Sequence, residues 1–336
     1  MKKIIAVILS LVLVLSMTAC GAKEAAPAET QAPEAAGAAT KLKVAIIQQL
    51  DHSSLDEIRE AIKAQLNTLA EPTNYTITIE EYNGQNDTSM LTQIATQVVA
   101  DEPDMIIPIA TLAAQYAVLA AEGTDIPIVY AAISDPEGAG LTGLANVTGV
   151  SDALNTPFIL DMMLAVQPDV KTVGLLYSTS EINSEAPIAE AKEYLDAKGI
   201  AYIEKTGTTT GEITEAAASL VGRVEAVFTP TDNAVMAAEA SVAELLNAGG
   251  IAHYTGADSF VQSGAFTTCG VNYTELGTKS ADIAFDILMG GEIGEFVVMD
   301  GGIITVNTDT AAAIGVDYEV FNTMANTVNA VTTIVD

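Results

Sequence analysis

The stretch that decides the fold is residues 44–69, VAIIQQLDHSSLDEIREAIKAQLNTL. It opens with a short apolar run, typical of a buried strand, and continues through a polar turn. Apolar residues then recur every three or four positions, which predicts an amphipathic helix; they are Leu55, Ile58, Ile62, Leu66 and Leu69. Ser54-Leu55-Asp56-Glu57 has a capping-box sequence, and we expect it to begin that helix.

The same alternation of short strand and helix runs along most of the chain. Further strands are predicted at 75–79, 105–109, 126–130 and 147–150, with helices at 90–100 and 113–121. A second series has strands at 172–177, 201–204, 226–229, 252–255 and 264–271, with helices at 156–166, 187–197, 212–221, 233–247 and 276–289. Strands that alternate with helices indicate βαβ units and parallel sheets. The sequence therefore predicts an α/β fold of two tandem parallel units.

The amino-terminal end has the pattern of an export signal. Lys2 and Lys3 precede an almost wholly apolar run that ends at Met17. Such a run is too short for a membrane span, which takes roughly 20 residues. The segment closes at Cys20 and resembles a bacterial lipobox, in which that cysteine carries the lipid, although leucine is more usual where Met17 stands. The alternative is an ordinary signal peptide with an incidental cysteine. We expect a signal peptide at 1–19 and a lipidated, flexible tether at 20–41.

Composition excludes several classes of function. The chain has 336 residues, of which 49% are hydrophobic, and a net charge of −31. A surface this acidic repels phosphate backbones, which excludes nucleic acid as a partner. Beyond Cys20, the sequence has Cys269 as its one other cysteine, so no disulfide framework is expected. His52 and His253 are too far apart in sequence for metal-ligand spacing, and we expect neither a metal nor a cofactor.

Six motifs carry a resemblance to a known family. They are residues 48–56, 109–115, 128–136, 177–184, 230–233 and 264–277. In this order they resemble the class I, Venus-flytrap solute-binding proteins of ABC importers, and within them the tryptophan/tyrosine (aromatic amino acid) binding family. Leu50 departs from the pattern, because an aromatic residue is usual there, and so does Asp258-Ser259, where an extra acidic residue is usual. These departures concern the identity of the ligand more than its class.

The resemblance implies a type I periplasmic binding protein fold, with two doubly wound parallel-sheet lobes joined by a three-strand hinge. It places lobe 1 at 42–151 plus 273–302 and lobe 2 at 152–272 plus 303–336. It also implies a monomeric lipoprotein at the extracytoplasmic face of the bacterial cell membrane. Its partners would be a free amino acid, an ABC permease and the ATPase of that permease.

Candidate ligand-binding residues follow the strand ends, because open parallel sheets bind ligands beyond the carboxyl ends of their strands. They are Gln49, His52, Ser54, Thr111, Ser134, Asp135, Tyr177, Glu181, Asn183, Ser184, Asp232, Asn233 and Asp258. Hydroxyls and backbone N–H groups at helix N-termini suit a ligand carboxylate, with Ser54, Thr111 and Ser184 as candidates. Glu181, Asp232 and Asp258 are candidates for the ammonium group. Each of these residues taken alone also suits an ordinary N-cap.

The aromatic and histidine candidates each have two interpretations. Tyr177 ends a predicted strand and either stacks on an aromatic ligand or packs in a core. His52 either contacts the ligand or merely completes the first loop, whereas His253 lies within a predicted strand and is expected to be structural. Residues 138–143 match the G-x-G-x-x-G dinucleotide fingerprint, but no strand directly precedes them and no helix follows, so we interpret them as a loop.

Three other functions remain as alternatives to the uptake of aromatic amino acids. The same fold could bind a branched-chain amino acid or another small solute, or present its ligand to a signalling partner. An exported hydrolase would need a nucleophile elbow, G-x-S-x-G, or a paired nucleophile and base. The sequence contains no such elbow, and neither histidine has an evident catalytic partner. We therefore expect a binding protein and not an enzyme.

Overall fold

A computed structural model describes residues 39–334 of the chain. The predicted signal peptide, Cys20 and nearly all of the predicted tether lie outside the described residues. Within 39–334, no helix has the length and apolar character needed to cross a membrane.

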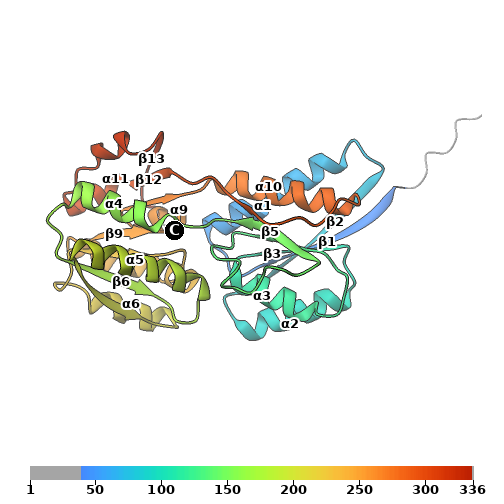
Figure 1. The fold of residues 1–336 in the computed structure, drawn as a ribbon, viewed down its shortest axis with the longest axis horizontal. Helices are drawn as coiled ribbons and strands as arrows, with labels where there is room; N and C mark the ends of the chain where they lie inside the picture. Colours follow the sequence, from blue (N-terminus) through green and yellow to red (C-terminus); the bar gives the residue numbers. More distant parts are fainter. Residues whose placement is uncertain (1–38, 335–336) are drawn as a thin grey trace, which may run out of the picture. The chain divides into compact units, whose positions relative to one another are not determined.

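The first sheet has six strands, all parallel, in the order β11-β5-β4-β3-β1-β2. The strands are β1 (Thr40–Gln48), β2 (Tyr75–Asn83), β3 (Met105–Ile109), β4 (Ile128–Ala131), β5 (Val147–Ser151) and β11 (Val297–Val298). Its helices are α1 (Ser53–Ala70), α2 (Thr88–Ala100), α3 (Thr111–Ala120) and α10 (Tyr273–Leu288). We call this sheet with its helices lobe 1. Figure 1 shows α1 and α10 together on one face of the sheet and α2 and α3 on the other.

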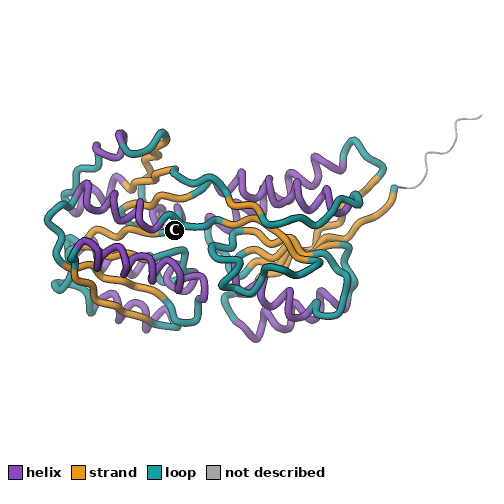
Figure 2. The backbone as a smooth tube through the Cα atoms, in the orientation of Figure 1, coloured by secondary structure: helices purple, strands orange, loops and turns teal. Residues whose placement is uncertain are grey.

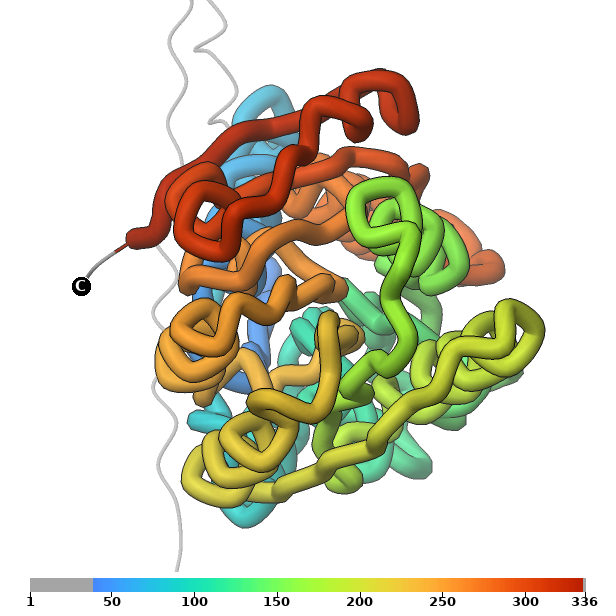
Figure 3. Tube along the Cα trace, turned by 90° about the vertical axis from the view of Figure 1, so that its left-hand side faces the viewer, coloured from blue at the N-terminus to red at the C-terminus, as the bar shows by residue number. Residues whose placement is uncertain are grey.

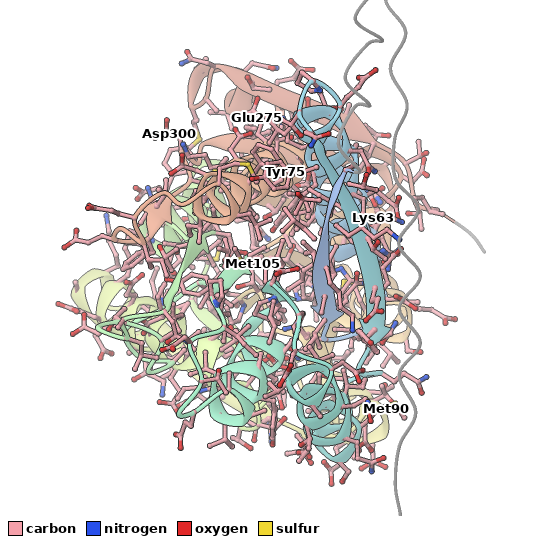
Figure 4. All side chains as sticks on the ribbon, turned by 90° about the vertical axis from the view of Figure 1, so that its right-hand side faces the viewer. Lys63, Tyr75, Met90, Met105, Glu275 and Asp300 are labelled. Atoms are coloured by element: carbon pink, nitrogen blue, oxygen red, sulfur yellow. The ribbon has the colours of Figure 1, made fainter. Side chains whose placement is uncertain are left out.

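The alternation of side chains along β1 explains why helices cover both faces. Val44 and Ile46 pack into the core beneath α1 and α10, whereas Ala45 and Ile47 pack beneath α2 and α3. A strand that is buried on both sides reads as a continuous apolar run, as this one does. In Figure 4 the fully buried Met105 lies in the interior of the lobe, and Met90 lies at its periphery.

A close helix contact completes lobe 1. A Cβ atom at Gly277 in α10 would lie 2.5 Å from the carbonyl oxygen of Ile58 in α1. Real Cβ atoms do not approach backbone that closely, so a glycine at this position lets the two helix backbones approach each other. The helix that follows the second series of strands thereby packs against the first helix of the chain.

The second sheet has seven strands in the order β13-β12-β10-β9-β8-β6-β7. They are β6 (Thr172–Tyr177), β7 (Ala201–Thr206), β8 (Ala226–Thr229), β9 (Ala252–Thr255), β10 (Thr267–Gly270), β12 (Ile303–Asn307) and β13 (Thr327–Val331). All neighbouring strands are parallel except β10 and β12, which are antiparallel. Figure 3 shows β12 and β13, in red, at one end of the sheet and the yellow segment with β7 and α6 at the other.

Helices again lie on both faces of this sheet, and we call the sheet with its helices lobe 2. The helices are α4 (Thr156–Val166), α5 (Glu185–Lys198), α6 (Thr210–Ala218), α7 (Asn233–Met236), α8 (Glu239–Ala248), α9 (Asp258–Gln262) and α11 (Thr308–Ile314), with short 3₁₀ turns at Ile182–Ser184 and Glu319–Thr323. One face packs on α4 and α5, and the other on α6 and α8.

The chain crosses between the two sheets three times. It leaves lobe 1 after β5, returns after β10 to form α10 and β11, and crosses again before β12. Figure 2 shows these crossings as loop segments in teal. The predicted α/β fold with two parallel-dominated sheets is therefore confirmed.

Three details differ from the sequence-based expectations. The predicted helix 233–247 is broken into α7 and α8, with a break at Ala237 and Ala238. The capping box predicted at Ser54 is wrong, because the N-cap of α1 is His52, two residues earlier, and no side chain caps the helix. Elements after residue 290 were not predicted, and they include the antiparallel partner of β10.

Candidate functional site

A small cavity lies where the strand ends of both lobes meet. Lobe 1 contributes His52, Ser54, Leu55, Ala110, Thr111, Ala132 and Ser134, lobe 2 contributes Asn183, Thr231, Asp232, Asn233, Met236, Ala257 and Phe260, and the crossing segments contribute Asp152 and Tyr273. Its volume is about 30 Å³, close to the share of one water molecule in the liquid. The two lobes thus enclose the site tightly.

A larger groove of about 710 Å³ adjoins this cavity along the crossing segments. It is lined by residues 152–155 and 301–303, by the end of β10 and by residues 322–327. We call it the hinge groove. Asp152 and Tyr273 line both spaces and so form the wall between them.

Four hydrogen bonds cross directly from one lobe to the other. Two lie in the cavity: the Ser134 and Thr231 hydroxyl oxygens are 2.7 Å apart, and His52 Nε2 lies 3.4 Å from Asn233 Oδ1. Behind it, Gln49 Nε2 donates to Glu181 Oε1 over 2.8 Å. The backbone N–H of Ser259 donates to the Ser54 hydroxyl over 3.3 Å. These contacts hold the lobes in a closed arrangement.

Two alanines in the cavity wall have unfavourable backbone conformations. Ala110 precedes α3 with φ 73° and ψ 163°, and Ala132 follows β4 with φ 58°. Positive φ is uncommon for residues with a Cβ, and such strain gathers at functional sites. Ala110 is followed by Thr111, whose backbone N–H, like those of the first turn of any helix, lacks a partner within the helix. The strained turn therefore sets a helix N-terminus in the cavity wall.

Asp232 is held by the protein from several sides. Its Oδ1 accepts from the Val235 N–H over 2.9 Å and so caps α7. Its Oδ2 accepts from the Ser178 N–H over 2.6 Å and from the Ser184 hydroxyl over 2.7 Å. The side chain is fully buried, and burial raises the pKa of its carboxyl.

Glu181 lies behind the cavity wall and is also buried. Its Oε1 accepts from Gln49, and its Oε2 accepts from Asn233 Nδ2 over 3.0 Å. Burial, together with the nearby Asp232 carboxyl, raises the pKa of Glu181 to about 8. The residue thus connects lobe 1 to the first residue of α7.

Asp152 follows β5 directly, at the first crossing between the lobes. Its Oδ1 accepts from the Ser134 hydroxyl over 3.0 Å. Burial raises the pKa of this carboxyl to about 6. Within residues 39–334, no lysine or arginine lines the cavity, so neither of its acidic residues faces a protein cation there.

His52 is neutral at physiological pH, because burial lowers its pKa to about 4. Asn233 donates through Nδ2 to Glu181, which leaves Asn233 Oδ1 to accept from His52 Nε2. With the proton on Nε2, His52 Nδ1 is an acceptor. It is buried and has no partner among the described residues.

The structure brings together many of the candidate residues and separates others. In the cavity wall lie His52, Ser54, Thr111, Ser134, Asn183, Asp232 and Asn233, and one layer behind lie Gln49, Glu181 and Ser184. Asp135, Tyr177 and Asp258 do not line it. Asp135 caps a loop through the Gly138 N–H, and the Tyr177 hydroxyl donates to Glu204 on β7. Asp258 is largely buried, which raises its pKa to about 6.

Family membership follows from a comparison of sequences. A model described as "ABC transporter substrate binding protein" matches residues 43–326. The chain belongs to that family. This substrate-binding protein is similar to a tyrosine-binding protein of Clostridioides difficile (strain R20291), with 32% identity over 321 residues that cover 93% of this chain and 92% of the relative.

Two solved structures are similar to this substrate-binding protein over most of its length. It is similar to an ABC domain from Streptococcus pneumonia in complex with L-Trp, with 28% identity, a TM-score of 0.80 and coverage of 86% of this chain and 100% of that one. It is also similar to a ligand-free, open substrate-binding protein from Clostridium difficile, with 30% identity, a TM-score of 0.66 and coverage of 87% and 100%. The TM-score is thus lower for the structure that is described as open.

Sequence reasoning missed several residues of the cavity wall. They include Asp152, Tyr273, Phe260 and Met236. Asp152 stands two residues after the strand predicted at 147–150, so the rule of strand ends could have found it. Phe260 and Met236 lie in helical segments whose apolar residues have the same spacing as core residues, and no local signal marks them. Tyr273 opens α10 and enters the wall only because the chain crosses between lobes there.

His253 and the glycine loop stand apart from this site, as expected. His253 is fully buried in lobe 2, where its ring nitrogens contact Glu239 and Thr229 over 3.0 and 2.8 Å. Residues 138–143 form a loop of turns and bends that contains neither strand nor helix. Among residues 39–334, no group of His, Cys, Asp and Glu side chains has the arrangement of a metal site.

Proposed function

We propose that this substrate-binding protein binds a free aromatic amino acid, tryptophan, tyrosine or phenylalanine, between its lobes and delivers it to an ABC import permease. Its family, the tyrosine-binding relative and the structural likeness to an L-Trp complex support the proposal. The observation that carries it is the composition of the cavity wall, which combines helix N-termini, hydroxyls, carboxylates and an apolar side.

Each part of an aromatic amino acid has a counterpart in that wall. The N-terminus of α3 at Thr111, with the hydroxyls of Ser54 and Ser134 beside it, suits the ligand carboxylate. The carboxylates suit the ammonium group. Phe260 and Met236 offer an aromatic ring and a polarisable sulfur to a ligand ring. His52 Nδ1 offers a buried acceptor to a ligand N–H or O–H group.

Entry of the ligand requires the lobes to move. A cavity of about 30 Å³ is far smaller than an amino acid, so the direct contacts between lobes must separate to admit it. We infer a hinge motion about the three crossings, with closure stabilised by contacts from both sides. The proposed lobe limits are 42–151 plus 273–302 and 152–272 plus 303–336.

The proposal extends to the location and partners of the protein. We propose that residues 1–19 are removed, that Cys20 carries the lipid, and that the tether to residue 41 holds a monomer at the extracytoplasmic face of the membrane. There it would serve a permease driven by an ATPase. Import is favoured over ligand presentation to a sensor because the family is one of transporter components.

A thermal-shift screen tests the proposed ligand. The lipid-free protein is heated with each common amino acid, with nucleosides and with sugars. A ligand at about 100 times its dissociation constant stabilises the folded state by roughly 2.7 kcal/mol. We expect tryptophan, tyrosine or phenylalanine to raise the melting temperature. A shift with leucine-type amino acids or sugars alone would contradict the aromatic assignment.

A further inference from the structure

We propose that Asp152, at the first crossing between the lobes, is the residue that binds the ammonium group of the bound amino acid. This inference rests on the proposed function, because it assumes a ligand with a free amine. It assigns the recognition of that amine to the hinge and not to an acidic residue of lobe 2.

The position of the acidic side chains supplies the first argument. Within the described part of the chain, Asp152 and Asp232 are the acidic residues that line the cavity. Glu181 lies behind the wall, where Gln49 and Asn233 occupy its two oxygens. Asp258 lines neither the cavity nor the hinge groove. The choice therefore falls between Asp152 and Asp232.

Hydrogen-bond capacity decides between these two residues. An ionised carboxylate has about four acceptor positions. In Asp232 the Val235 N–H, the Ser178 N–H and the Ser184 hydroxyl occupy both oxygens at short distances. A ligand ammonium would have to compete with the helix cap for them. Asp232 therefore has a structural task that already uses three of its about four acceptor positions.

The carboxylate of Asp152 has hydrogen-bond acceptor positions that no donor in the described part of the protein occupies. Besides its own backbone N–H, the one group among residues 39–334 that donates to its carboxylate is the Ser134 hydroxyl, at 3.0 Å from Oδ1. Its exposed fraction is 6%, so water solvates it little. A buried carboxylate without a cationic partner is unfavourable, and a bound ammonium group would relieve that cost.

The neighbouring hydroxyls link this carboxylate to both lobes. An ionised Asp152 can only accept, so the single proton of the Ser134 hydroxyl points to it. Ser134 must then accept from the Thr231 hydroxyl, 2.7 Å away. The resulting chain runs from lobe 2 through lobe 1 to the hinge. An ammonium group on Asp152 would strengthen this chain, because charged groups polarise the hydrogen bonds next to them.

Ligand pairs that differ only in the amine test the inference. The whole chain is titrated with tyrosine and with 3-(4-hydroxyphenyl)propionate, and with tryptophan and indole-3-propionate. We expect the wild-type protein to favour the amino acid of each pair by about 10- to 100-fold, the range for a charge-assisted hydrogen bond. In Asp152→Asn this preference should fall below about 3-fold, with little change for the deaminated compounds.

Two control variants make the test specific. Asp135→Asn changes a strand-end acid outside the cavity and should keep the full preference. Asp232→Asn changes the rival carboxylate of the cavity wall: it should lower the melting temperature, because it weakens the cap of α7, and its ligand preference shows whether lobe 2 binds the amine. If Asp152→Asn does not fold, Asp152→Ser, which retains a partner for Ser134, replaces it with the same expectations.

The outcomes separate this inference from the proposed function. Absence of binding by the wild-type protein to tyrosine, tryptophan and phenylalanine would refute the function itself. Wild-type preference that survives in Asp152→Asn would refute only the inference. Loss of preference in Asp232→Asn with retention in Asp152→Asn would refute it as well, and would return the ammonium site to lobe 2.

Discussion

Gln49 Nε2 in lobe 1 donates to Glu181 Oε1 in lobe 2 over 2.8 Å, and both side chains are buried. Gln49 Oε1 also accepts from the Leu112 N–H in the first turn of α3, and Glu181 Oε2 accepts from Asn233 at the start of α7. This pair therefore connects the two helix N-termini that stand in the cavity wall. We expect it to act as a latch on the closed arrangement.

Removal of the latch should favour the open arrangement. Gln49→Ala leaves a buried oxygen of Glu181 without its donor, which costs about 1–3 kcal/mol in the closed form only. We expect a larger radius of gyration in X-ray scattering and an affinity about 10-fold lower for the ligand. Gln97→Ala changes an exposed glutamine of α2 and serves as the control. Scattering curves that coincide for both variants would show that the lobes close without Gln49.

Asp152→Asn should stabilise the ligand-free protein at neutral pH. Burial raises the pKa of this carboxyl from 3.8 to about 6, so the folded state binds its proton more tightly than the unfolded state. The charged form then costs about 3 kcal/mol above pH 6, and this cost disappears below pH 4. Melting curves at pH 7 and pH 3.5 measure the difference.

Other titratable side chains lie near Asp152, and their contribution to the melting temperature has to be separated from that of Asp152. Tyr273, Asp232 and His52 line the same cavity and are present in both proteins, so their titration cancels in the comparison. The variant should melt higher than the wild-type protein at pH 7 and at about the same temperature at pH 3.5. A gain that is equal at both pH values would show that packing, and not charge, is the cause.

Ala110→Gly should relieve backbone strain. A residue with a Cβ at φ 73° and ψ 163° carries about 1–3 kcal/mol of strain, whereas glycine adds about 0.5–1 kcal/mol of entropy to the unfolded chain. We expect a net gain of up to about 2 kcal/mol in the free energy of unfolding, measured with urea. The control is Ala113→Gly, within the helix that Ala110 precedes, which should lose about 1 kcal/mol. A loss in both variants would show that Ala110 is not strained.

Cys269 should react slowly with thiol reagents in the native protein. The side chain is 3% exposed, and burial raises the pKa of its thiol to about 11. Only the thiolate reacts, so labelling at pH 8 should be at least about 100-fold slower than in the unfolded chain. A chain that begins at residue 21 avoids the second thiol. Equal rates before and after unfolding would contradict the burial of Cys269 in the wall of the hinge groove.

Periodicity predicted the elements that pack locally. The limits of β3, β6, β8, β9 and α4 agree with the structure to the residue. The break between α7 and α8 was missed, because the sequence is apolar and helix-favouring across Ala237 and Ala238. Strand β12 could have been predicted, because residues 303–306 form a β-branched run. Its antiparallel pairing with β10, in contrast, leaves no local pattern in the sequence.

The rule of strand ends located the site but not the role of each side chain. Tyr177 ends β6, yet its hydroxyl points to Glu204 on the neighbouring strand. The sequence does not show on which face of the sheet the side chain of a strand's last residue lies. Nor does it tell that the oxygens of Asp232 are occupied while those of Asp152 are largely free. Whether an acidic residue is available to a ligand depends on donors from distant segments, which only the folded chain brings together.

The packing of α10 against α1 governs the order in which the protein can fold. During translation, residues 39–151 emerge well before residues 273–288, and until α10 follows, the face of their sheet beneath Ile58 and Ile62 stays partly uncovered. Lobe 2 in turn awaits β12 and β13 at the end of the chain. Neither lobe can therefore complete its fold before the segments after residue 272 are present, and an incomplete chain exposes apolar surface to which chaperones can bind.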